Sequence, residues 1–299
     1  MKVNWKYLVN RYKIIEKKLD VNSFTVLMKS VVDDEIYDIC AIGENIYSVS
    51  NSGLILLNTG ETIVNGEDSV GKERFGTLRH SRLVFPTSLC IHLSNIITCE
   101  ASGRIIRRID LDSRWTKHEN KTMKFVEEFR KMPENSPTGI TAEANDIMWV
   151  VAERDVSYAC RHGDTRKLAG TGKRGYSCSQ TALLSQIAYP CGIAANSKTV
   201  YISEMMNRCI RYIQNGQISF LCGCPKEDIL VNPKKVIHLR NQLLVVDDGV
   251  LKSITINDGI TRAIPVYNAT EVISVCLADK RILILAKDGK ENTKNTKRT

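Results

Sequence analysis

The sequence predicts an all-β fold, a six-bladed β-propeller with a short N-terminal helix. Two observations predict the propeller: a unit of short, β-branched strands recurs along the chain, and its copies lie at blade-like intervals. The clearest unit runs through residues 189–195, 199–204 and 207–213, and an acid, Glu204, ends its second strand. Each strand is too short to be stable alone, so its apolar residues must pack against neighbouring copies.

The copies of this unit can be aligned on its proline, Pro190, or on the residue in the equivalent place. These anchors lie at positions 36, 86, 137, 190, 233 and 272, and they are separated by 50, 51, 53, 43 and 39 residues. Propeller blades of three or four strands recur at about this spacing. A solenoid is the competing arrangement, but solenoids need distinctive polar capping repeats. Six copies therefore predict six blades.

The two ends of the chain carry separate predictions. Apolar residues fall on one face at the helical period, so residues 1–22 are expected to form an amphipathic helix and a linker. This helix would cap the propeller or dock on a partner through Trp5, Leu8, Tyr12 and Ile15. Too little chain follows Lys287 to finish a four-stranded blade, so the strand within residues 23–32 is expected to close the last one. The propeller then occupies residues 23–288, and residues 289–299 form a basic disordered tail.

The unit at residues 168–213 resembles the repeat of the NHL β-propeller family. The resemblance rests on the glycine-rich lead-in Gly170-Thr-Gly-Lys-Arg-Gly175, on Pro190 to Ile193, on Tyr201 to Glu204 and on Asn207 to Arg211. This chain has Glu153 and Glu204 where the family usually has Asp. The resemblance implies a propeller that acts by binding, because some NHL propellers bind single-stranded RNA on a basic face.

The formal net charge of +9 lies mainly at the chain ends. Residues 1–20 carry +4 and residues 287–299 carry +3, which leaves +2 for residues 21–286. Local basic clusters could still meet on adjacent blades, although interspersed acids favour a solvated charged face. The candidate residues for a nucleic acid or another partner are Arg104, Arg107, Arg108, Arg114, Lys117, Arg166, Lys167, Lys173 and Arg174.

The residues that could carry chemistry have structural explanations. The five histidines show no metal-like spacing such as HxxxH. Cys40, Cys90 and Cys276 occupy equivalent positions in three copies, where they could share a metal or simply pack as small buried residues, as Ala194 does. The acids that end the second strands are expected to accept N–H bonds in the turns that follow. We therefore predict no metal, no cofactor and no enzymatic activity.

These observations favour a non-catalytic protein-interaction scaffold. Single-stranded RNA binding through a basic face of blades 2–4 is the alternative, and a metal-centred propeller hydrolase or lyase is the third hypothesis. We expect a protein partner and no membrane association, because the chain has neither a signal peptide nor an apolar run long enough to span a bilayer. Ten scattered cysteines then suggest an intracellular chain, cytoplasmic or nuclear.

Overall fold

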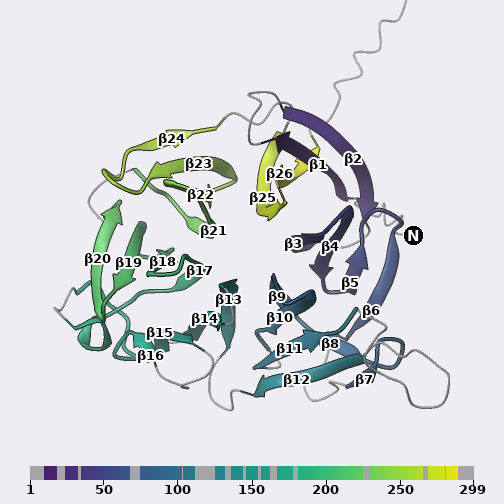
Figure 1. Ribbon diagram of the computed structural model, residues 1–299, viewed down its shortest axis with the longest axis horizontal. Helices are drawn as coiled ribbons and strands as arrows, with labels where there is room; N and C mark the ends of the chain where they lie inside the picture. The colour runs from purple at the N-terminus through teal and green to yellow at the C-terminus, as the bar shows by residue number, and fades with distance from the viewer. Residues whose placement is uncertain are drawn as a thin grey trace, which may run out of the picture.

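In the computed structural model, the strands form six sheets arranged as a ring around a central axis (Figure 1). The structure describes residues 10–18, 24–32, 35–67, 75–102, 104–111, 125–131, 136–143, 146–153, 156–161, 167–177, 181–224, 229–264, 269–279 and 281–288. This is an all-β propeller, and within these ranges its helical structure is limited to one 3₁₀ turn, Ala182–Leu184. None of the described helical structure is long and apolar enough to cross a membrane.

Three of the sheets run from the axis outwards as four consecutive antiparallel strands. They consist of β13 (Pro137–Glu143), β14 (Asp146–Glu153), β15 (Val156–Arg161) and β16 (Lys167–Ala169); of β17 (Pro190–Ala195), β18 (Thr199–Glu204), β19 (Cys209–Gln214) and β20 (Gln217–Cys222); and of β21 (Pro233–Leu239), β22 (Gln242–Asp247), β23 (Val250–Thr255) and β24 (Thr261–Ala263).

Two sheets have five strands because short segments join their outer edges. One contains β3 (Ile36–Ile42), β4 (Asn45–Ser50), β5 (Gly53–Leu56), β6 (Glu61–Glu67) and, parallel to β6, β8 (Arg82–Val84). The other contains β9 (Pro86–His92), β10 (Asn95–Glu100), β11 (Ile105–Ile109), β12 (Phe125–Lys131) and β7 (Gly76–Thr77).

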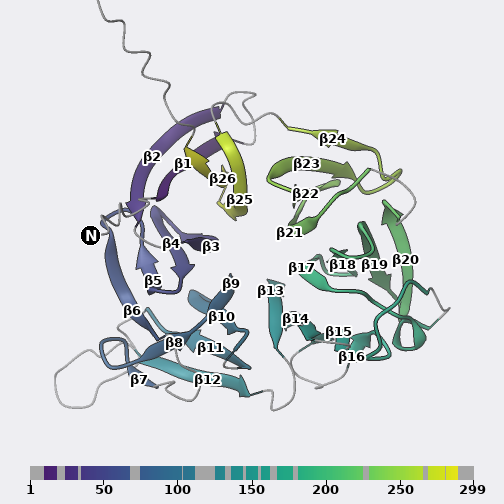
Figure 2. The same ribbon diagram turned by 180° about the vertical axis from the view of Figure 1, so that it is seen from behind.

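The last sheet joins the two ends of the chain. It has the order β2 (Phe24–Val32), β1 (Asn10–Lys18), β26 (Arg281–Asp288) and β25 (Ala269–Ala278), with β25 nearest the axis (Figures 1 and 2). The strand that we expected to close the ring, β2, is the outer strand of this sheet, but β1 lies between it and β26. The antiparallel β1–β26 pairing runs from Tyr12–Lys287 to Lys18–Arg281.

The predicted N-terminal helix is wrong for residues 10–18, which form β1. The reason is that both faces of this sheet are covered by neighbouring sheets. Ile14 packs with Ile39 of β3, whereas the next residue, Ile15, packs with Val246 of β22. Apolar residues at consecutive positions of a strand imitate a helical period. Trp5 and Leu8 lie outside the described residues, as do residues 289–299.

Neighbouring sheets pack face to face throughout the ring, and this packing forms the core. In the sheet β17–β20, Ile193 and Ile202 contact Met148 and Val150 of the preceding sheet. Ala194, on the opposite face, packs with Val236 of the following sheet. Burial on both faces explains why the strands are almost continuously apolar rather than alternating.

Four of the inner strands, β9, β13, β17 and β21, begin with a proline, so we call the face of the ring at which the inner strands begin the proline face. Each second strand ends beside this proline, as the partners Pro190–Glu204 and Pro233–Asp247 show. The turns that follow the second strands therefore lie on the proline face, whereas the turns after the inner strands lie on the opposite face.

Candidate functional site

Acids at the ends of the second strands tie each sheet to the chain that leads into it. The carboxylates of Glu100, Glu204 and Asp247 accept backbone N–H bonds from Val84 at 2.6 Å, Ala188 at 3.0 Å and Val231 at 3.0 Å. In all three cases the donor precedes the acid by 16 residues. The acids do accept N–H bonds, and these three backbone donors lie in the segment before the inner strand. The turn that Glu204 opens adds a side-chain donor, because the Nδ2 atom of Asn207 donates to its Oε2 atom at 2.6 Å.

The same acids pair with a basic residue on the third strand. Glu100 forms an ion pair with Arg107, and Glu204 contacts Arg211 at 3.1 Å, with all four side chains fully buried. Asp247 forms the equivalent ion pair with Lys252 on β23, at 2.7 Å. Arg107 is therefore buried and paired inside the protein, so it does not lie on the binding surface to which the sequence assigned it.

Of the other basic residues proposed from the sequence, the structure describes five. Arg108 is exposed on β11 and Arg104 is half-buried beside it, whereas Arg114, Lys117 and Arg166 lie outside the described residues. Lys167 and Lys173 are exposed before β17, and the half-buried guanidinium of Arg174 stacks over the ring of Tyr189 at 5.0 Å. Of the four proposed partner-helix residues, Tyr12 belongs to β1 and Ile15 is buried in the core.

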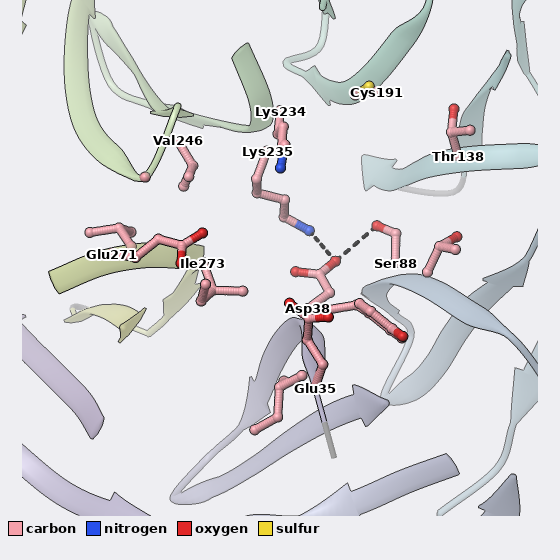
Figure 3. A pocket seen from close by; sticks show the side chains of 15 residues that line it. Glu35, Asp38, Ser88, Thr138, Cys191, Lys234, Lys235, Val246, Glu271 and Ile273 are labelled. Carbon is pink, nitrogen blue, oxygen red and sulfur yellow. Dashed lines mark hydrogen bonds and ion pairs between the residues drawn. The ribbon is translucent and has the colours of Figure 1, made fainter. Parts of the chain in front are cut away.

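A channel along the axis of the ring contains one buried carboxylate, that of Asp38 on β3. This carboxylate accepts hydrogen bonds from the backbone N–H of Ile39 (2.9 Å) and Leu89 (2.8 Å), and from the hydroxyls of Ser88 (2.8 Å) and Ser274 (2.5 Å). The ammonium of Lys235, on β21, contacts its Oδ2 atom at 2.6 Å (Figure 3). The three inner strands β3, β9 and β25 and the more distant β21 therefore converge on a single carboxylate.

Lys235 divides the channel into two cavities. The cavity at the proline face has a volume of about 270 Å³ and the cavity at the opposite face about 260 Å³, and Lys235 lines both. Burial of Lys235 lowers its pKa, but the charge and hydrogen bond of Asp38 raise it by more, so the pKa lies above its ordinary value. The ammonium is thus held in its charged form by a carboxylate that approaches from across the channel.

The three cysteines at equivalent positions meet in the cavity at the opposite face. Cys40, Cys90 and Cys276 all line it, on β3, β9 and β25. Burial raises the pKa of each thiol, to about 12 for Cys276, so the sulfurs are held as neutral thiols at neutral pH. Within the described ranges, no three His, Cys, Asp or Glu side chains are placed to hold a metal ion.

Exposed apolar side chains gather on the proline face of the two sheets β17–β20 and β21–β24. Met206, in the turn between β18 and β19, is 57% exposed, and Val231, just before β21, is 48% exposed. Ile229 and Val250 are exposed beside Val231. Sequence analysis missed these residues because they lie in connections or, for Val250, at the first position of β23, where no period distinguishes them. For Met206 and Val250, the available signal was their position two or three residues after the acids Glu204 and Asp247.

Comparison with known proteins supports the fold. Neither a family model nor a curated protein matches the chain, so membership of the NHL family is not shown. Among solved structures, a chain in the nidogen–laminin complex is similar with a TM-score of 0.60 at 14% identity, over 93% of this chain and 99% of that one. Virginiamycin B lyase from Staphylococcus aureus is similar with a TM-score of 0.51 at 15% identity, over 92% and 99%. At these identities the likeness concerns architecture, and in architecture this chain is a β-propeller.

Proposed function

We propose that this propeller is a non-catalytic protein-interaction module of the NHL type, and that it binds its partner on the proline face of the sheets β17–β20 and β21–β24. The observation that carries the proposal is the exposed apolar surface formed there by Met206, Ile229, Val231 and Val250. Exposed apolar side chains that lie together, rather than singly, are typical of interaction sites.

The segments that carry these four residues touch one another. Gly223 lies against both the carbonyl of Arg208, in the turn of Met206, and the buried side chain of Leu230. Two residues after Leu230, the carbonyl of Asn232 accepts the N–H of Asp248, in the turn before Val250, at 3.2 Å. The segments that carry the exposed side chains therefore support one another, and they offer a partner a pre-formed surface that costs little conformational entropy on binding.

The axial channel is better explained as a structural feature than as a reaction centre. A catalytic acid or base needs a group that can exchange a proton with a substrate. The Asp38 carboxylate is surrounded by the donors that hold it, and the ammonium of Lys235 is paired with it. The similarity in fold to virginiamycin B lyase is the reason that a propeller lyase or hydrolase stands as the third hypothesis.

Single-stranded RNA is the alternative ligand. Lys167 and Lys173 are exposed before β17 and favour it, because Lys and Arg on one face supply the electrostatic part of RNA binding. Arg107 is buried in an ion pair with Glu100, so it is not available to bind RNA.

The test is quantitative affinity purification of the tagged full chain from its native cells. The double variant Met206→Asp/Val231→Asp is compared with wild type and with Leu93→Asp. Leu93 is 68% exposed in the turn after the inner strand β9, so it probes the opposite face with the same chemical change. We expect specific proteins to be retained by wild type and by Leu93→Asp and lost from the double variant. Equal retention by all three, or nuclease-sensitive retention, contradicts the proposal.

A further inference from the structure

We infer that the partner presents an acidic segment with apolar side chains, which binds the proline face of the sheets β17–β20 and β21–β24. This inference rests on the proposed function and specifies the chemistry of the partner. It follows from the cations that surround the apolar surface described above.

Cations outnumber carboxylates around the apolar surface. Among the described residues on the proline face of these two sheets, the accessible charges are those of Lys173, Arg174, Arg208 and Lys234 against Asp248, and Glu271 of the next sheet adds a second carboxylate beside Gly249. The acids nearest to them in sequence, Glu204 and Asp247, are buried in their own ion pairs and do not offset this charge at the surface.

One of these cations has a fixed position. The guanidinium of Arg174 stacks over the ring of Tyr189, whose carbonyl accepts the N–H of Met205 at 3.0 Å. The same lead-in is tied to the turn of Met206, because the Nδ2 atom of Asn207 donates to the carbonyl of Gly175 at 2.9 Å. A stacked guanidinium keeps its hydrogen-bond donors in a plane that matches a carboxylate. The backbone of Lys234 is held in β21, and the residue lines the axial cavity at the proline face.

The placement of apolar and basic groups determines the kind of ligand. Met206 lies between the Arg174 lead-in and the segment of Val231, so apolar contacts run between basic groups on the two sheets. A protein segment in which Asp or Glu accompanies Leu, Phe or Met matches both features. Single-stranded RNA would also match the cations and would find an aromatic ring in Tyr176, which is 42% exposed beside Arg174. Its polar backbone and bases do not match the aliphatic side chains of Met206 and Val231, so a protein segment accounts for more of the surface.

The experiment measures the fluorescence anisotropy of labelled peptides with the purified full chain. The probes are a peptide of alternating Glu and Leu, the same peptide with Lys for Glu, the same peptide with Ser for Leu, and single-stranded oligo(U). The protein variants are Lys234→Glu, Arg174→Glu and Met206→Ser. The matched control is Lys198→Glu, an exposed lysine in the turn between β17 and β18, on the opposite face. Circular dichroism confirms that each variant is folded.

The Glu–Leu peptide is expected to bind wild type and Lys198→Glu equally, and to bind Lys234→Glu or Arg174→Glu about tenfold more weakly. Both altered peptides should bind more weakly than the parent. The inference is overturned if the Glu and Lys peptides bind equally. It is also overturned if the Glu–Leu peptide fails to bind while oligo(U) binds wild type and not Lys234→Glu. If Met206→Asp/Val231→Asp loses its cellular partners but no peptide binds the wild-type chain, only the acidic segment is rejected. The proposed function then stands.

Discussion

The ammonium of Lys235 lies 2.6 Å from the carboxylate of Asp38, across the axial channel and 197 residues away in the sequence. The sheet that contains β25 separates their two inner strands around the ring, so this ion pair braces strands that are not neighbours. Such a contact depends on the closed ring. A variant that loses this ion pair therefore tests how much the pair contributes to the stability of the closed propeller.

Asp38→Asn should reduce the free energy of unfolding by about 3 kcal/mol, because it leaves the charge of Lys235 in the channel without its partner. Lys235→Met should cost less, since Asp38 keeps its hydroxyl and N–H donors. The double variant should be less destabilised than the sum of the two. Urea unfolding of the four proteins measures this coupling, and strictly additive losses would show that the pair contributes nothing.

Glu204→Ala should destabilise the chain by about 3–5 kcal/mol, because it leaves Arg211 charged and buried and the N–H of Ala188 without its acceptor. The comparison is Glu44→Ala, which removes a carboxylate that also pairs with an arginine, Arg281, but is 84% exposed. That change should alter stability by less than about 0.5 kcal/mol. Similar losses in the two variants would refute the structural role of the buried acid.

Gly192→Ala should destabilise the ring by roughly 3 kcal/mol or more, since the new Cβ would lie 2.1 Å from the carbonyl oxygen of Lys234 on the next inner strand. Gly43→Ala is the control. Its Cβ would meet no atom within 4 Å, so only the positive φ of +58° is strained, at a cost of about 1 kcal/mol. Thermal unfolding should rank Gly192→Ala well below Gly43→Ala.

Alkylation of Cys191 reports on the cavity at the proline face. Burial raises the pKa of this thiol to about 11, so at pH 8 its thiolate fraction is about two orders of magnitude below that of an unfolded cysteine. Labelling by iodoacetamide in the native chain should therefore be slow at pH 8 and rise about tenfold per pH unit up to pH 10. Mass spectrometry of the peptide containing Cys191 gives the rate. A plateau below pH 9 would contradict this environment.

The strand pattern was predictable because each repeat carries the same chemistry. The anchors at 36, 86, 137, 190 and 233 are the first residues of β3, β9, β13, β17 and β21. Four of these anchors are prolines, and proline is tolerated at the start of a strand, where its missing N–H removes no ladder bond. The glycines at 139 and 192 lie against the carbonyl oxygens of Cys191 and Lys234 on the next inner strand, where a Cβ atom would clash.

What could not be predicted depends on contacts between distant segments. The helical period around Ile14 and Ile15 is produced by a strand with both faces buried, which only the closed ring supplies. The pairing of Arg107 with Glu100 turned an apparent surface cation into an internal one. Met206 and Val231 carry no period, and they become neighbours only when the sheets β17–β20 and β21–β24 pack together.

The most direct test of the proposed binding surface is site-specific photo-crosslinking in the native cell. A photoreactive amino acid is placed at Met206, at Val231 or, as the control on the opposite face, at Leu93. Discrete protein adducts at positions 206 and 231, with none at 93, are the predicted result. Adducts confined to position 93, adducts removed by ribonuclease, or no adduct at either 206 or 231 would contradict the assignment of the proline face as the partner-binding surface.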